Sequence, residues 1–153
     1  MKYMFASDVH GSAYYCRKML EAYDEEKAER LVLLGDLLYH GPRNDLPKEY
    51  APKEVIKMMN GMKNDIYAVR GNCEAEVDQM VLEFPVMADY CILAINGLTF
   101  YATHGHVYTR PNNNLCGIAR FSGEFNQDPC QFTVEQIEVV RPFNTYFIRT
   151  QIA

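Results

Sequence analysis

The sequence lacks the features that would point to a membrane, a nucleic acid or a disulfide framework. No apolar run in its 153 residues approaches the ~20 residues needed to span a bilayer. Lysine and arginine number 15 against 20 acidic residues, so the formal net charge is −5 and no basic surface for nucleic acid is indicated. The cysteine count is odd, at five, and no two cysteines form a C-x-x-C pair, which favours reduced thiols. These absences predict a cytoplasmic protein with neither a membrane nor a nucleic-acid partner.

The composition is that of an ordinary globular protein. Hydrophobic residues make up 48% of the chain and charged residues 23%. The N-terminal residues form a strand-like run rather than a signal peptide with a basic head. The length suits one domain with its own core, and we expect a single domain over residues 1–153.

Apolar runs and helical patterns alternate along the first two thirds of the chain. We expect strands at 2–6, 31–34 and 66–69, and helices at 12–26, 52–60 and 74–84. Two further runs, 90–95 and 98–103, flank Asn96-Gly97, the strongest short hairpin signal. After residue 108 only weak strand signals remain, at 132–134 and 146–152. The order predicts an α/β fold in which a parallel sheet with crossover helices is extended by antiparallel strands.

Short polar motifs stand at the ends of four of these apolar runs. They are Asp8-Val9-His10, Gly35-Asp36, Gly71-Asn72 and His104-Gly105-His106. Carboxylate, imidazole and amide groups are ligands of divalent metals, and strand ends at one sheet edge are where open α/β folds place their sites. Positions i and i+2 of a strand point the same way, so Asp8 and His10 are expected to hold one ion together. The four motifs together predict a metal site, with two metals.

Each motif alone also has a plainer interpretation, and at this level both stay open. Asp8 could cap the following helix, and Asp36 could satisfy N–H groups in a turn. Gly71-Asn72 could be only a turn, and a single histidine is more often structural. Ligand side chains at the ends of four apolar runs are what favours the metal site.

The motifs also resemble those of a known family. The stretches in question are DVHG at 8–11, GDLLYHGPRN at 35–44, RGNCE at 70–74 and THGH at 103–106. Together they resemble the calcineurin-like metallophosphoesterases, and among these the small bacterial YfcE-type phosphodiesterases. The resemblance covers residues 1–108, and residues 109–153 form a divergent tail.

The resemblance implies a four-layer α/β/β/α sandwich that holds two divalent metals, commonly Mn²⁺. By motif position, Asp8 and His10 would hold the first metal, Asp36 would bridge both, and Asn72 and His104 would hold the second. His106 belongs to the motif but is not counted as a ligand. The implied activity is hydrolysis of a small-molecule phosphodiester by a metal-activated water.

Cys73 departs from the family pattern. It follows Asn72 where many members carry a histidine that can protonate the leaving group, and a thiol is a poorer acid. We therefore treat Cys73 as a candidate catalytic residue or as a small buried hydrophobe. His40 and Arg43, on the long loop after residue 37, are candidates for contact with the substrate phosphate.

A second departure concerns ligand number. The family closes its site with a later G-H-x-H motif, and no histidine follows His106 in this sequence. Each metal would then keep three protein ligands, which can still hold a catalytic ion. The alternative is a catalytically weak or inactive protein of the same fold that serves as an interaction module. The natural substrate and homo-oligomer formation are left open.

Overall fold

A five-stranded sheet forms the centre of the protein, and a three-stranded sheet lies against one of its faces. The computed structural model describes residues 2–95, 98–107, 118–121, 137–140 and 145–148. The strands are β1 Tyr3–Ala6, β2 Arg30–Leu33, β3 Ile66–Ala68, β4 Cys91–Ile95, β5 Leu98–Ala102, β6 Ile118–Phe121, β7 Ile137–Val140 and β8 Thr145–Ile148. The larger sheet has the order β3-β2-β1-β8-β7, and the smaller has the order β4-β5-β6.

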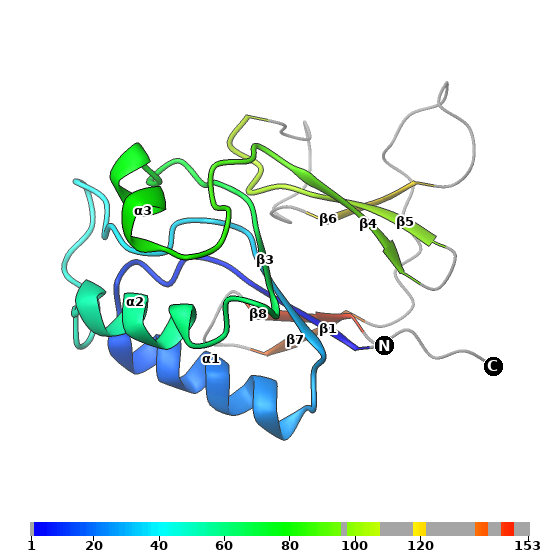
Figure 1. The fold of residues 1–153 in the computed structure, drawn as a ribbon, viewed down its shortest axis with the longest axis horizontal. Helices are drawn as coiled ribbons and strands as arrows, with labels where there is room; N and C mark the ends of the chain where they lie inside the picture. The colour runs from blue at the N-terminus through cyan, green and yellow to red at the C-terminus, as the bar shows by residue number, and fades with distance from the viewer. Residues whose placement is uncertain (1, 96–97, 108–117, 122–136, 141–144, 149–153) are drawn as a thin grey trace.

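Helices α1 (Ala13–Glu25) and α2 (Pro52–Asn60) cover the other face of the larger sheet (Figure 1). The described residues thus supply α/β/β layers of the predicted sandwich. None of the helices in this described part is long and apolar enough to cross a membrane.

The parallel part of the larger sheet arises from strands that are buried on both faces. β1 pairs in parallel with β2, and β2 pairs in parallel with β3. In β1, Met4 and Ala6 belong to the core beneath the helices, whereas Tyr3 and Phe5 belong to the core between the sheets. Because successive side chains point to opposite faces and both faces are covered, the strand reads as a continuous apolar run. The three predicted parallel strands are confirmed.

The predicted hairpin forms, but the prediction that it extends the parallel sheet is wrong. β4 and β5 pair antiparallel with Ile95 opposite Leu98, and β6 adds to β5 to complete a separate sheet. The turn at Asn96-Gly97 lies outside the described residues. Alternate residues of β4 and β5, such as Leu93 and Phe100, are buried against the larger sheet. One face of the hairpin is apolar, and it is covered by packing face to face rather than by pairing edge to edge.

Strand β8 is what extends the parallel sheet. It pairs antiparallel with β1, with Tyr3 opposite Ile148, and β7 pairs with β8. The strand predicted over 146–152 is thus present, but β8 begins at Thr145, one residue before the predicted start. The last residues of the predicted strand lie outside the described part. The expected strand at 132–134 also lies outside it.

The boundaries of α1 and α2 follow from their capping residues. Ser12 precedes α1, and its Oγ accepts a 3.2 Å hydrogen bond from the backbone N–H of Tyr15. Pro52 begins α2 and Gly61 follows its last residue, as predicted.

Helix α3 (Glu76–Val81) is shorter than the predicted 74–84. Beyond it, Leu82, Phe84 and Val86 are buried at every second position, and Pro85 interrupts the run. A period of two and a proline both favour extended backbone over helix, which explains the earlier end.

Candidate metal centre

The loops after β1 and β2 are joined to each other by backbone hydrogen bonds that continue the strand pairing. The N–H of Asp8 donates to the carbonyl of Gly35 at 3.0 Å, and the N–H of His10 donates to that of Asp36 at 2.8 Å. Asp8, His10 and Asp36 all adopt left-handed backbone, with φ of 61°, 49° and 58°. The two loops therefore run side by side beyond the carboxyl ends of their strands, where open α/β folds place their ligand-binding sites.

Asp8 and His10 come together for a reason other than the predicted one. β1 ends at Ala6, so neither residue is in a strand and the alternation of side chains does not apply to them. Instead, both residues turn through left-handed conformations on either side of Val9. Non-glycine residues adopt this conformation uncommonly, and such strain concentrates at functional sites.

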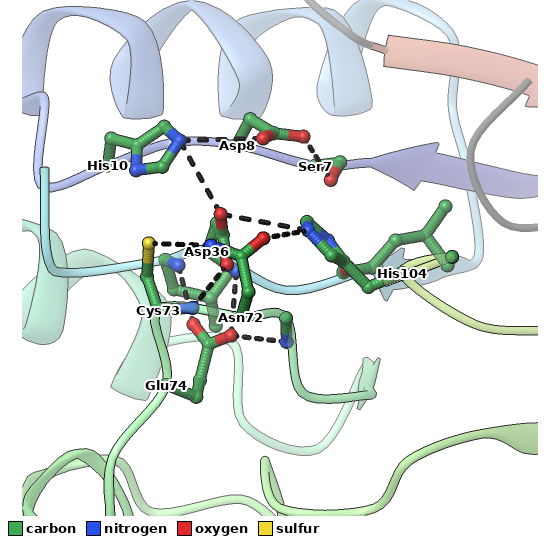
Figure 2. A network of polar contacts seen from close by, with 12 residues as sticks. Ser7, Asp8, His10, Asp36, Asn72, Cys73, Glu74 and His104 are labelled. Atoms are coloured by element: carbon green, nitrogen blue, oxygen red, sulfur yellow. Dashed lines mark hydrogen bonds and ion pairs between the residues drawn. The ribbon is translucent and has the colours of Figure 1, made fainter. Parts of the chain in front are cut away.

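Asp36 lies between two histidines. Its Oδ2 is 3.7 Å from Nε2 of His10 and 3.7 Å from Nε2 of His104, and its side chain is 4% exposed (Figure 2). Its other oxygen, Oδ1, accepts a 2.9 Å hydrogen bond from the backbone N–H of Cys73. One carboxylate oxygen is thus held by the protein while the other faces both imidazoles.

Backbone carbonyls fix which nitrogen each imidazole turns inward. Nδ1 of His10 lies 2.7 Å from the carbonyl of Tyr39, and Nδ1 of His104 lies 2.7 Å from the carbonyl of Leu34. A carbonyl can only accept, so Nδ1 donates in both residues and the neutral ring presents its lone pair on Nε2. This is the arrangement by which proteins orient histidines that bind metals.

The inward-facing nitrogen and oxygen atoms bring their lone pairs close to one another. Nε2 of His104 is 3.1 Å from Oδ1 of Asn72, and Nε2 of His10 is 3.4 Å from Oδ1 of Asp8. Such atoms repel unless a proton or a cation lies between them. Neighbouring ligands of an octahedral ion, each at about 2.1 Å, stand about 3 Å apart. The donor set therefore fits divalent metal.

Two overlapping sets of residues could hold a metal ion in the described part of the chain. One is Asp8, Asp36 and His104, and the other is His10, Asp36 and Cys73; within each set the ligand atoms lie within 4.8 Å of one another. All the side chains predicted as ligands lie in this one cluster, with Asn72 reaching it through its contact to His104. Asp36 belongs to both sets.

The electrostatics of the cluster favour positive charge. Contact with the Asp8 carboxylate raises the pKa of His10 to about 9, although burial opposes this. Burial raises the pKa of Asp8, but contacts with His10 and Ser7 outweigh it and bring the pKa below its ordinary value. Burial and then the Asp36 carboxylate raise the pKa of the Cys73 thiol to about 12.

Glu74 holds the loops of the site together, a role that the sequence analysis missed. Its carboxylate accepts hydrogen bonds from the backbone N–H groups of Asp36 and Leu37, each at 2.7 Å, and from that of Gly71. Burial raises the pKa of Glu74, while these three N–H groups act in the opposite direction. The available signal was a carboxylate in the same short motif as Asn72.

Two glycines allow the loops to approach closely. Gly35 has φ of 97°, and a Cβ there would lie 2.2 Å from the backbone nitrogen of Gly71. A Cβ on Gly71 would lie 2.1 Å from Oδ1 of Asp36. Neither position has room for a side chain. The positive φ of Gly35 confirms the sharp turn expected there.

The loop that carries His40 and Arg43 borders the site. Tyr39 accepts the hydrogen bond from His10, and Gly41 lies against Cys73, since a Cβ on Gly41 would be 3.7 Å from the Cys73 sulfur. The ring of His40 contacts the rings of Tyr39 and Tyr50 edge-on, and within the described residues its Nδ1 is buried without a hydrogen-bond partner. Arg43 is exposed.

His106 lies beside the cluster rather than in it. Its ring centroid is 5.3 Å from that of His104, and it belongs to neither set of candidate ligands in the described part. Burial, followed by the neighbouring His104 and Arg70, lowers the pKa of His106.

The chain is similar to known proteins in sequence. The sequence model of the family described as calcineurin-like phosphoesterase matches residues 1–142, which extends past the motifs and includes β6 and β7. Phosphodiesterase YfcE of Escherichia coli strain K12 is 46% identical over 112 residues, an alignment that covers 73% of this chain and 61% of that protein. Phosphodiesterase MJ0936 of Methanocaldococcus jannaschii is 26% identical over 112 residues, covering 69% of this chain and 60% of that protein.

A solved structure shows the same fold. The structure of YfcE, described as a phosphoesterase from E. coli, superposes with a TM-score of 0.71 at 44% identity, covering 76% of this chain and 64% of that one. The chain thus spans about three fifths of the length of the curated relatives it matches. From the family match and these similarities, the chain belongs to the calcineurin-like phosphoesterase family.

Proposed function

We propose that this chain is a divalent-metal-dependent phosphodiesterase with a dinuclear centre built around Asp36. The observation that carries the proposal is the position of Asp36 Oδ2, 3.7 Å from the inward Nε2 atoms of both His10 and His104. A carboxylate that lies between two imidazole nitrogens is suited to bridging two cations, one bound by each imidazole. Family membership and the names of the relatives, both called phosphodiesterases, support the same reaction class.

In this proposal Asp8, His10 and Asp36 hold the first metal, and Asp36, Asn72 and His104 hold the second. Mn²⁺ is the proposed ion. Two bound divalent cations would lower the pKa of a water molecule and neutralise charge on the phosphoryl oxygens. The products of the reaction are a phosphomonoester and an alcohol.

The chain's own residues orient the centre and bind the substrate. The carbonyls of Tyr39 and Leu34 keep His10 and His104 in the tautomer that faces inward. On the bordering loop, we assign contact with the substrate phosphate to Arg43, an exposed cation, and to His40, whose Nδ1 lacks a partner in the described residues.

Protonation of the leaving group is the weak point of this site. Cys73 stands where many members of the family carry a histidine, and a thiol is a poorer acid than an imidazolium for protonating a leaving group. Esters with good leaving groups, such as aryl esters, are therefore the favoured substrates.

Hydrolysis of bis-p-nitrophenyl phosphate with added Mn²⁺ tests the proposal. The wild-type chain should release p-nitrophenol, and Asp36→Ala should reduce the rate to background. Metal-saturated wild-type protein that is no faster than Asp36→Ala would contradict phosphodiesterase activity. That outcome would favour the interaction module, for which the lack of any histidine after His106 is the sequence argument.

A further inference from the structure

Cys73 places its sulfur near His10 and Asp36, two of the residues proposed to hold the first metal. The ligand atoms of His10, Asp36 and Cys73 all lie within 4.8 Å of one another. Figure 2 shows the sulfur directed toward the side of the cluster where His10 lies, away from Glu74. Nδ1 of His10 already donates to the carbonyl of Tyr39, so Nε2 is the nitrogen left to bind the same ion as this sulfur.

The sulfur is held in this position from two sides. The side-chain amide Nδ2 of Asn72 donates to Sγ at 3.2 Å, and the backbone N–H of Cys73 donates to Oδ1 of Asp36 at 2.9 Å. Gly41 is also nearby, since a Cβ built on it would lie 3.7 Å from the sulfur. An N–H donor aimed at a sulfur favours the negatively charged form of that sulfur once a cation is near it.

Packing alone does not account for Cys73. Its side chain is only partly buried, and it belongs to neither apolar core of the described residues. Cys16, in contrast, is fully buried in the core beneath the helices, which is the usual environment of a structural cysteine.

We propose that Cys73 is a thiolate ligand of the first metal, beside His10 and Asp36, so that this position carries a nitrogen, oxygen and sulfur donor set. On binding, the S–H bond breaks, the sulfur–metal bond forms, and the proton passes to solvent. Thiolate ligands select softer ions, so this position should prefer Zn²⁺, Co²⁺ or Cd²⁺ over Mn²⁺ more strongly than carboxylates and histidines alone would. The inference rests on the metal centre of the proposed function and refines which ion it takes.

Cobalt spectroscopy on the full chain tests the assignment. The chain is stripped with a chelator and titrated with Co²⁺, and a near-ultraviolet sulfur-to-cobalt charge-transfer band should appear with the wild-type protein. Cys73→Ser should lose this band while keeping the weaker visible bands of bound Co²⁺. Cys91→Ser, which removes a partly buried thiol from β4, should keep the charge-transfer band.

Affinities give a second and independent readout. Cys73→Ser should weaken Cd²⁺ binding on the order of tenfold or more but Mn²⁺ binding less than about threefold, because only the softer ion gains much from sulfur. Equal losses for the two ions would show a general structural effect and overturn the assignment.

The outcomes separate this inference from the proposed function. Co²⁺ bound without a charge-transfer band, or with a band that survives in Cys73→Ser, would overturn the role of Cys73 and leave the metal centre standing. No bound Co²⁺ and no bound Mn²⁺ in the wild-type chain would overturn both.

Discussion

The backbone N–H of Asp36 donates a 2.7 Å hydrogen bond to the carboxylate of Glu74, which lies 38 residues later in the chain. The same carboxylate accepts from Leu37 and Gly71, so one side chain fastens the loop after β2 to the loop after β3. Glu74 is in neither set of candidate ligands in the described part of the chain. It acts by setting the backbone from which Asp36 and Asn72 project.

Replacing Glu74 should weaken metal binding without removing a ligand. In Glu74→Gln the amide nitrogen would face a backbone N–H, leaving a buried donor unpaired, and we expect a loss in Mn²⁺ affinity of about 10- to 100-fold. Electron paramagnetic resonance of free Mn²⁺ measures this.

Two further variants separate positioning from general destabilisation. Glu74→Asp keeps two acceptor oxygens and should recover part of the affinity. The matched control is Glu83→Gln, which removes only an exposed ion pair with Lys63. Equal Mn²⁺ affinity in Glu74→Gln and Glu83→Gln would refute the positioning role.

A methyl group at Gly71 should displace Asp36. The Cβ of Gly71→Ala would lie 2.1 Å from Oδ1 of Asp36, so this contact must shift, at a cost of about 1–3 kcal/mol in the free energy of unfolding and with loss of tight metal binding. Gly61→Ala is the control, because its Cβ would be no closer than 3.2 Å to the carbonyl of Met58. Thermal unfolding and metal titration check both, and Mn²⁺ affinity unaffected by Gly71→Ala would contradict the close contact.

The parts of the fold that depend on local pattern could be predicted from the sequence. The run Leu31–Leu34 ends at a glycine, and α2 is bounded by Pro52 and Gly61, so their positions followed from residue type alone. The sheet to which the hairpin belongs could not be read this way. An apolar face on β4 and β5 indicates only that something covers it, and tertiary packing decides whether a strand edge or another sheet does so.

The sequence indicates which side chains form the candidate site, but not which backbone contacts position them. Asp8, His10, Asp36, Asn72 and His104 were recognised because their side chains are ligands by type. Glu74 was missed because its partners are backbone N–H groups, which every residue has and which the sequence does not distinguish. The left-handed backbone at Asp8 and His10 was missed because it is uncommon outside glycine.

The loop at 39–44 should affect substrate binding and leave metal content unchanged. Arg43→Ala removes a cation suited to phosphate, and we expect KM for bis-p-nitrophenyl phosphate to rise about 3- to 10-fold, with a similar rise for His40→Ala. Lys53→Ala, which removes an exposed cation from α2, is the control and should leave KM unchanged. Unchanged kinetics in both loop variants would remove His40 and Arg43 from the substrate site.

The thiols of Cys16 and Cys91 should resist alkylation at mild pH. Burial raises the pKa of Cys16 to about 12 and that of Cys91 to about 11, so both remain neutral thiols near pH 8. Because the thiolate is the reactive form, iodoacetamide should modify them about a hundredfold or more slowly than free cysteine, and the rate for Cys91 should rise about tenfold per pH unit up to pH 11. Peptide mass spectrometry measures this, with urea-unfolded chain as the reference, and rates equal to that reference at pH 8 would contradict the burial.

The metal content of the purified chain tests the central claim most directly. After loading with Mn²⁺ and dialysis, elemental analysis should find two ions per wild-type chain and none tightly bound in Asp36→Ala, because this carboxylate lies between both candidate positions. The dinuclear account is contradicted if the loaded wild-type chain retains no Mn²⁺, or if Asp36→Ala retains as much as the wild type.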